Sequence, residues 1–306
     1  MKYLHLEILY ACLWMLSKLP MRLLYIVSDF FFLVIYYVLG YRKKVVVQNI
    51  SYVFPNKTAQ EKEKITKAFY HHLTDLIVES LKGFSISKEE ILKRYTYKNP
   101  EVIDNYIQQG KSIALMGSHL GNWEWIINLP LVLNIKVYGS YSKLKNDFFE
   151  KKMKQNREKF GFIGVKTSDT VKKMLQNKKN NIQSLYILLS DQSPMVEKTL
   201  YWSHFFGVQL PIHTGAESIS KKFDFVVINS VVRKIKRGYY ETEYEVITDE
   251  PNSFNDYEIT EKYLKRTEEF IRNQPEIYLW SHNRFKHQHR FEEWTNMNIA
   301  KKKTKS

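Results

Sequence analysis

Short apolar runs alternate with longer amphipathic segments along this chain, which predicts an α/β protein. Residues 113–116 are apolar and end at Gly117, a pattern typical of a buried strand that stops at a turn. Residues 123–131 then look helical, with Asn122 as their N-cap. Four more strands are expected, over residues 135–141, 184–190, 225–233 and 239–247. We therefore expect a mixed central sheet flanked by helices.

Helical segments surround these strands. Thr58 and Glu61 form a capping box, and apolar side chains recur at helical spacing over residues 65–81. His71 and His72 fall within this helix, where we interpret them as structural or solvated residues. Further helices are expected over residues 89–95, 102–109, 146–160, 170–175 and 258–273.

The N-terminal segment carries two apolar runs, residues 4–16 and 23–39. The second run is at the short limit for a membrane span, which needs about 20 residues. Asp29 interrupts it, and a central aspartate costs about 3 kcal/mol in a spanning helix. A spanning pose, burial on the protein and a pose in the membrane interface therefore all stay open. A cleaved signal peptide is disfavoured because no small-x-small cleavage site follows, so residues 1–45 are expected to be a retained membrane anchor.

The composition of the chain indicates the size of its domain and the chemical class of its partners. A chain of 306 residues with 44% hydrophobic residues can bury the core of one larger domain. A net charge of +15 and an aromatic share of 15% indicate an anionic, partly apolar partner, such as a membrane surface, a phospholipid, an acidic carrier protein or nucleic acid. No nucleic-acid-binding motif accompanies the charge. Arg42, Lys43 and Lys44 favour a cytoplasmic catalytic domain. Cys12 is the only cysteine, so internal disulfides are excluded.

The turn after residues 113–116 carries the candidate chemistry. His119 lies just past the predicted strand end, and Glu124 lies in the first turn of the following helix. A neutral histidine accepts a proton at physiological pH when a partner fixes its tautomer, and Glu124 is the expected partner. The base would act on a hydroxyl of the substrate, without a covalent enzyme intermediate. Gly117 and Gly121 bracket the histidine, as a close backbone approach requires.

The sequence supports a serine nucleophile or a zinc site at this turn less well than a histidine base. Ser118 adjoins His119 but lacks the Gly-x-Ser-x-Gly turn of serine hydrolases. A zinc site needs about three protein ligands, and the sequence has no His-Glu-x-x-His motif or cysteine cluster. A histidine and a glutamate at this spacing also occur by chance, but the strand end and the two glycines favour a catalytic pair.

The segment Gly117-Ser-His-Leu-Gly-Asn-Trp-Glu124 resembles the His-x4-Asp/Glu motif of glycerolipid acyltransferases, in the form found in late lipid A biosynthesis acyltransferases. Similar family segments lie on both sides of it, in family order over most of the chain: Tyr41 to Asn49 with Phe54-Pro55, Leu188 to Gln192, Phe205 to Gly207, Thr214-Gly215, and Pro275 to Lys286. The resemblance implies an enzyme that adds a secondary acyl chain to a lipid A precursor. It implies acyl carrier protein thioester as the donor and no cofactor.

The resemblance also implies substrate contacts. The block from Tyr141 to Asn146 lacks the arginine usual in the family, so Lys143 would offer a point charge in place of a guanidinium fork. Ordinary turns and a solvated helix face are the alternative uses of these residues. The expected substrate-binding residues are Gly117, Asn122, Lys143, Asn146, Asp191, Gln192 and Arg233.

These observations combine into one prediction. Residues 1–45 anchor the protein on the cytoplasmic face of the inner membrane, residues 46–295 form the acyltransferase domain, and residues 296–306 are a basic disordered tail. His119 removes the proton of an acceptor hydroxyl and Glu124 orients the base. A glycerophospholipid, an amino-acid lipid or another glycolipid stays open as the acceptor. A non-catalytic module that binds anionic lipid is the alternative from another class.

Overall fold

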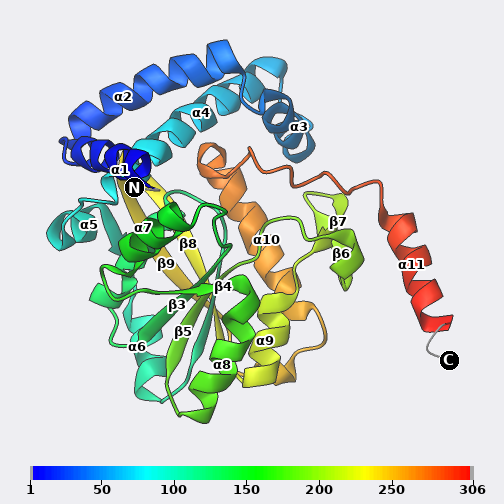
Figure 1. Ribbon diagram of the computed structural model, residues 1–306. Helices are drawn as coiled ribbons and strands as arrows, with labels where there is room; N and C mark the ends of the chain where they lie inside the picture. Colours follow the sequence, from blue (N-terminus) through cyan, green and yellow to red (C-terminus); the bar gives the residue numbers. More distant parts are fainter. Residues whose placement is uncertain (1–2, 304–306) are drawn as a thin grey trace.

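The computed structural model describes residues 3–303 (Figure 1). Its α-helices are α1 (Leu4–Ser17), α2 (Met21–Leu33), α3 (Lys43–Val53), α4 (Ala59–Lys82), α5 (Lys88–Arg94), α6 (Glu101–Gln108), α7 (Asp147–Glu158), α8 (Thr170–Lys179), α9 (Gly215–Phe223), α10 (Glu258–Asn273) and α11 (Phe291–Lys303). A π-helical turn, η1 (Val34–Leu39), continues α2. The 3-10 helices are η2 (Trp123–Leu131), η3 (Thr167–Asp169), η4 (Val196–Lys198), η5 (Pro251–Ser253) and η6 (Pro275–Ile277).

A seven-stranded mixed sheet forms the centre of the protein, in the order β1-β9-β8-β2-β5-β3-β4. β2, β3, β4, β5 and β8 run parallel, while β9 is antiparallel to β8. A separate hairpin is formed by β6 and β7. The strands are β1 (Tyr95–Tyr97), β2 (Ile113–Gly117), β3 (Lys136–Tyr141), β4 (Ile163–Lys166), β5 (Ser184–Leu189), β6 (Tyr201–Phe205), β7 (Val208–Ile212), β8 (Val226–Lys236) and β9 (Tyr239–Thr248).

Alternate residues of the central strands enter two different apolar clusters. Ile113 and Leu115 of β2 belong to the large core cluster, whereas Ala114 between them belongs to a smaller one. Met174 of α8 and Phe223 of α9 complete the smaller cluster, and Figure 1 shows both helices lying along the sheet. Because side chains of a strand point alternately to the two faces, β2 must be apolar throughout to be covered on both. All five of its residues are buried.

The N-terminal helices form a layer at one end of the sheet, with α4 at its centre (Figure 1). The capping box of Thr58 and Glu61 begins α4 as predicted, with both reciprocal hydrogen bonds present. α2 lies along α4 and contributes Met21 and Leu24 to a small cluster with Val78. Phe32 of α2 enters the large core cluster, whereas Leu23, Ile26, Phe30 and Leu33 are exposed. Met21–Leu39 as a whole is only 22% buried.

The architecture confirms the predicted mixed sheet flanked by helices, with an apolar helix near the N-terminus. The short strands β1 and β4 and the β6–β7 hairpin were not expected, because three to five residues carry too weak a pattern. The predicted disordered tail also differs, since α11 continues to Lys303. Its residue Trp294 contacts Trp202 of β6, which anchors the helix start. Residues 304–306 of that tail lie outside the described residues.

Candidate active site

Two neighbouring strands bring chemically active side chains to one edge of the sheet. β2 and β5 are parallel, with Gly117 paired to Leu189, and the Ser190 amide donates to the Gly117 carbonyl at 3.1 Å. His119 follows the end of β2, and Asp191 follows the end of β5. Since carboxyl ends of parallel strands meet at the same edge, these residues come together although they lie 72 positions apart.

His119 is held by both oxygens of the Asp191 carboxylate. Its Nδ1 lies 2.8 Å from Oδ1, and its backbone N–H donates to Oδ2 at 3.1 Å. The Asp191 side chain is only 1% exposed, whereas that of His119 is 17% exposed. An ionised carboxylate accepts from the ring only where the nitrogen carries a proton, so Nδ1 is the protonated atom of the neutral ring. The lone pair of the neutral ring therefore lies on Nε2.

The contact between His119 and Asp191 shifts the pKa of both residues. Burial lowers the pKa of His119, but the charge and hydrogen bond of Asp191 outweigh burial and raise the pKa above 6.5. Burial raises the pKa of Asp191, but the contacts with His119 outweigh it and hold the pKa below 3.8. Asp191 is thus ionised at neutral pH, and its charge favours the protonated form of His119.

The free side of the imidazole faces a cavity of about 500 Å³. Gln192 places its Nε2 at 3.2 Å from the His119 Nε2 and donates to it. The Trp123 ring stands edge-on to the imidazole, with ring centroids 5.3 Å apart. Apolar side chains line much of the cavity: Ile126, Ile127, Phe162, Val171, Ile187, Leu188, Leu189 and Ile219. The cavity therefore suits a molecule with a polar reactive group and an apolar chain.

Comparison with known protein families identifies the family of the chain. The model of the bacterial lipid A biosynthesis acyltransferase family matches residues 1–287, which include every strand of the sheet. The chain belongs to this family. It is therefore an acyltransferase of lipid A biosynthesis. None of the curated proteins matches the chain.

Glu124 of this acyltransferase is placed differently from the prediction. Its carboxylate lies 3.3–3.4 Å from the guanidinium nitrogens of Arg157 on α7. The carboxylate bonded to the His119 ring is that of Asp191 instead. The reason is local, because η2 begins at Trp123 and its first turn directs Glu124 toward α7. Glu124 still lines the cavity beside His119.

The segment from His119 to Glu124, here called the His119 turn, depends on a glycine. Gly121 has φ +55°, and a Cβ on it would lie 2.8 Å from a methyl group of Val232. Asn122 accepts a hydrogen bond from the Trp125 amide at 3.2 Å, which confirms the predicted N-cap. Asn122 is completely buried and lies outside the cavity lining, so its contact is with the protein interior.

The other predicted substrate contacts divide into two groups. Gln192 lines the cavity and Asp191 lies behind His119. The remaining residues do not line the cavity, because local partners hold them elsewhere. Lys143 is half exposed and forms an ion pair with Asp147, and Arg233 forms one with Glu243. Asn146 caps α7 by accepting a hydrogen bond from the Phe149 amide. The Gly117 carbonyl accepts hydrogen bonds from the Ser190 amide and the Tyr263 hydroxyl.

Sequence reasoning did not place a cation and a second histidine in the cavity, and the structure shows both. Arg157 reaches the cavity from the last turn of α7. His213 lies directly before the Thr214-Gly215 pair, which alone carried the family signal. Burial lowers the pKa of His213, with a further contribution from Arg284, so His213 is neutral at physiological pH.

Proposed function

We propose that this acyltransferase moves a fatty acyl chain from an acyl carrier protein thioester to a hydroxyl of a lipid A precursor, with His119 as the general base. One observation carries the proposal: the buried Asp191 carboxylate holds His119 by Nδ1, while Nε2 points into a cavity with apolar walls. This arrangement supports a base acting on a substrate hydroxyl beside a bound acyl chain.

The reaction is a direct acyl transfer. His119 Nε2 takes the proton of the acceptor hydroxyl while its oxygen forms a bond to the thioester carbonyl carbon. The resulting tetrahedral oxyanion collapses, the carbon–sulfur bond breaks, and the carrier thiolate takes the proton from the imidazolium. Asp191 stabilises the imidazolium between these steps, and no enzyme side chain is acylated.

Gln192 and Arg157 are the groups that support stabilisation of the oxyanion. The Gln192 amide contacts His119 Nε2 at 3.2 Å, so an acceptor hydroxyl that replaces this contact lies beside the Gln192 N–H groups. Arg157 lines the same cavity and brings the guanidinium that position 143 lacks. Donors and cations aimed at a developing negative charge commonly supply the largest catalytic term.

The acceptor is tested by lipid A itself. Mass spectra of lipid A from cells with and without this gene product should differ by one acyl chain, because the reaction adds one chain per acceptor. Restoring the wild-type protein should restore the heavier species. Unchanged lipid A in the deletion strain would exclude this acceptor and favour another membrane lipid.

The N-terminal helices support an interfacial anchor. Glu7 of α1 pairs with Lys152 of α7 at 3.6 Å, and the Ser85 hydroxyl donates to the Ser17 carbonyl at the end of α1. At mid-length of α2, Asp29 pairs with Arg237 at 2.6 Å. These contacts hold the chain to the catalytic domain both before α2 and along it, which supports a position in the interface over one across the bilayer. We propose that α1 and α2 lie in the cytoplasmic interface of the inner membrane.

The single cysteine of the chain tests this placement. Cys12 is exposed on α1, which would reach the periplasm if α2 spanned the membrane. We expect a membrane-impermeant maleimide to leave Cys12 unlabelled in intact spheroplasts and to label it in inverted vesicles or detergent. A Cys12→Ser variant provides the background. Labelling of Cys12 in intact spheroplasts would show that α2 spans.

A further inference from the structure

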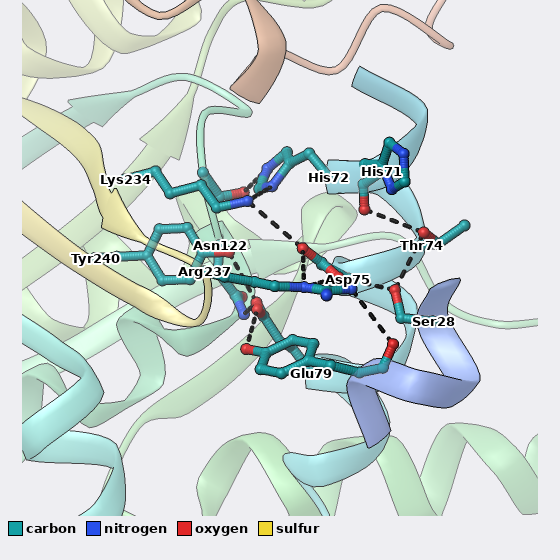
Figure 2. Close-up of polar contacts among 12 residues, drawn as sticks. Ser28, His71, His72, Thr74, Asp75, Glu79, Asn122, Lys234, Arg237 and Tyr240 are labelled. Carbon is teal, nitrogen blue, oxygen red and sulfur yellow. Dashed lines mark hydrogen bonds and ion pairs between the residues drawn. The ribbon is translucent and has the colours of Figure 1, made fainter. Parts of the chain in front are cut away.

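A buried carboxylate outside the cavity lies behind the His119 turn. Glu79 of α4 is 0% exposed, and Figure 2 shows it at the meeting point of several elements. It accepts hydrogen bonds from the hydroxyls of Tyr25 and Tyr240, both at 2.9 Å, and from the Asn122 amide at 2.7 Å. All three donors are neutral. Burial raises the pKa of Glu79 to about 7.

The His119 turn is attached to α4 at several points. Asn122 donates to Glu79 and accepts from the Trp125 amide, so one side chain both anchors the turn and caps η2. The Trp125 indole donates to the Glu79 carbonyl at 3.3 Å. His72 is neutral because burial lowers its pKa to about 3, and its Nε2–H donates to the Gly121 carbonyl at 3.3 Å. The backbone between His119 and Glu124 therefore follows α4.

The same carboxylate is attached to the apolar helix α2. Tyr25 lies on α2, within the one segment of the described residues that is long and apolar enough to cross a membrane. One helical turn away on α4, Asp75 accepts from Ser28 of α2 at 2.8 Å. Arg237 bridges Asp75 and Asp29, with both contacts at 2.6 Å. Figure 2 shows Arg237 beside Asp75. Glu79 thus connects the membrane-facing helix to the His119 turn.

Stability alone does not account for this arrangement. Burying a carboxylate without a bonded cation is costly, and an apolar residue of similar volume would stabilise a core at least as well. The carboxylate instead fixes the positions of its partners, because each hydrogen bond holds one partner side chain in one geometry. The partner on the far side is the turn that sets the position of His119.

We infer that Glu79 is a positioning residue for acyl transfer: through Asn122 it holds the His119 turn, and through Tyr25 it makes the placement of that turn depend on α2. This role rests on the proposed function of His119 as the base. Its consequence is that α2 acts on turnover as well as on membrane attachment.

A reciprocal exchange tests the contact between Glu79 and Asn122. The substitution Asn122→Asp keeps the cap on η2 but sets two carboxyl groups 2.7 Å apart. We expect kcat per folded enzyme to fall by about 100-fold with KM within about threefold, because a shift of about 1 Å at reacting groups costs that much. In the double variant Glu79→Gln with Asn122→Asp, the new amide donates to the new carboxylate. We expect its kcat to return to within about tenfold of wild type.

The measurement uses the full chain in detergent micelles, with acyl carrier protein thioester and a lipid A precursor as substrates. Circular dichroism gives the folded fraction and Tm of each variant. Glu79→Gln alone should retain kcat within about fivefold, because its carbonyl accepts from Asn122 and its amide donates to Tyr25. A double variant that regains Tm but not kcat would overturn the inference, as would a wild-type kcat in Asn122→Asp.

The connection to α2 is tested by removing one hydroxyl. Tyr25→Phe deletes only the donor from α2 to Glu79, and we expect kcat to fall by about three- to tenfold with KM unchanged. Tyr37→Phe is the matched control, since Tyr37 is 62% exposed on the continuation of the same helix. Equal kcat values for the two variants would overturn the connection. If Asn122→Asp fails to fold, the comparison of Tyr25→Phe with Tyr37→Phe still tests the positioning role of Glu79.

The two proposals fail in different ways. If His119→Ala retains turnover, the assignment of the base is wrong, whatever the Glu79 variants do. If His119→Ala abolishes turnover while Tyr25→Phe and the exchanged pair behave like wild type, only the positioning role of Glu79 is wrong.

Discussion

Replacing His119 with alanine is expected to lower kcat for acyl transfer by about 10³-fold or more. A positioned general base contributes about 10²- to 10⁴-fold to a rate. In the described residues, no other neutral nitrogen base is bonded to Asp191 and could replace it. Initial rates with purified protein measure this. His119→Asn is the stricter variant, since its side-chain amide still donates near the position of Nδ1 but has no Nε2. We expect both variants to lose turnover, with Asn retaining more of the wild-type Tm.

His204→Ala is the control for this result. His204 is exposed on β6 and does not line the cavity, so its loss should leave kcat within about twofold of wild type. A His119→Asn enzyme that turns over at the wild-type rate would exclude His119 as the base and would direct attention to His213, the other neutral histidine of the cavity.

Asp191→Asn is expected to lower kcat by about 10³- to 10⁴-fold without unfolding the protein. The asparagine amide can donate to Nδ1 and so favours the tautomer with the proton on Nε2, which cannot accept the hydroxyl proton. The measurement is kcat against pH, with Asp147→Asn as a control that removes a carboxylate from the exposed start of α7. Turnover near the wild-type level in Asp191→Asn would contradict the proposed orientation of the ring.

The pH profile of the same variants separates the two carboxylates. The proposed base must be neutral to accept a proton, so activity of the wild type should rise with pH through the pKa of His119, which Asp191 holds above 6.5. Removing the Asp191 charge leaves burial as the main influence, and burial lowers this pKa, so the acid limb should move to lower pH. Glu124→Gln should move it less, because Glu124 bonds Arg157 and not the ring. A larger shift in Glu124→Gln would restore Glu124 as the partner of the base.

Local signals predicted the elements of this site well. The apolar residues 113–116 became β2, Asn122 capped the following helix, and Thr58 with Glu61 began α4, because each depends on contacts within a few residues. The histidine at a strand end was also predictable, since parallel strands of α/β proteins present polar residues at their carboxyl ends. The 3-10 form of the helix over residues 123–131 was not predicted, because its pattern indicated only a helix.

The partner of His119 shows where such reasoning stops. Glu124 was the natural choice in the sequence because it lies five residues away, but the chain turns at Gly121 and carries it toward Arg157. Asp191 lies 72 positions away and reaches the ring only because β2 and β5 are adjacent in the sheet. The same limit applies to Lys143, which pairs with its helical neighbour Asp147 while Arg157 occupies the cavity wall.

The sequence by itself determined the fold class, the family and the histidine of the candidate site, because strand patterns, caps and the His-x4-Glu spacing are written in neighbouring residues. Only the tertiary structure decided which carboxylate orients that histidine, which cation lines the cavity, and how Glu79 ties α2 to the His119 turn. Each of these contacts joins residues from different elements. Their distances follow from strand order and helix packing, which no local pattern specifies.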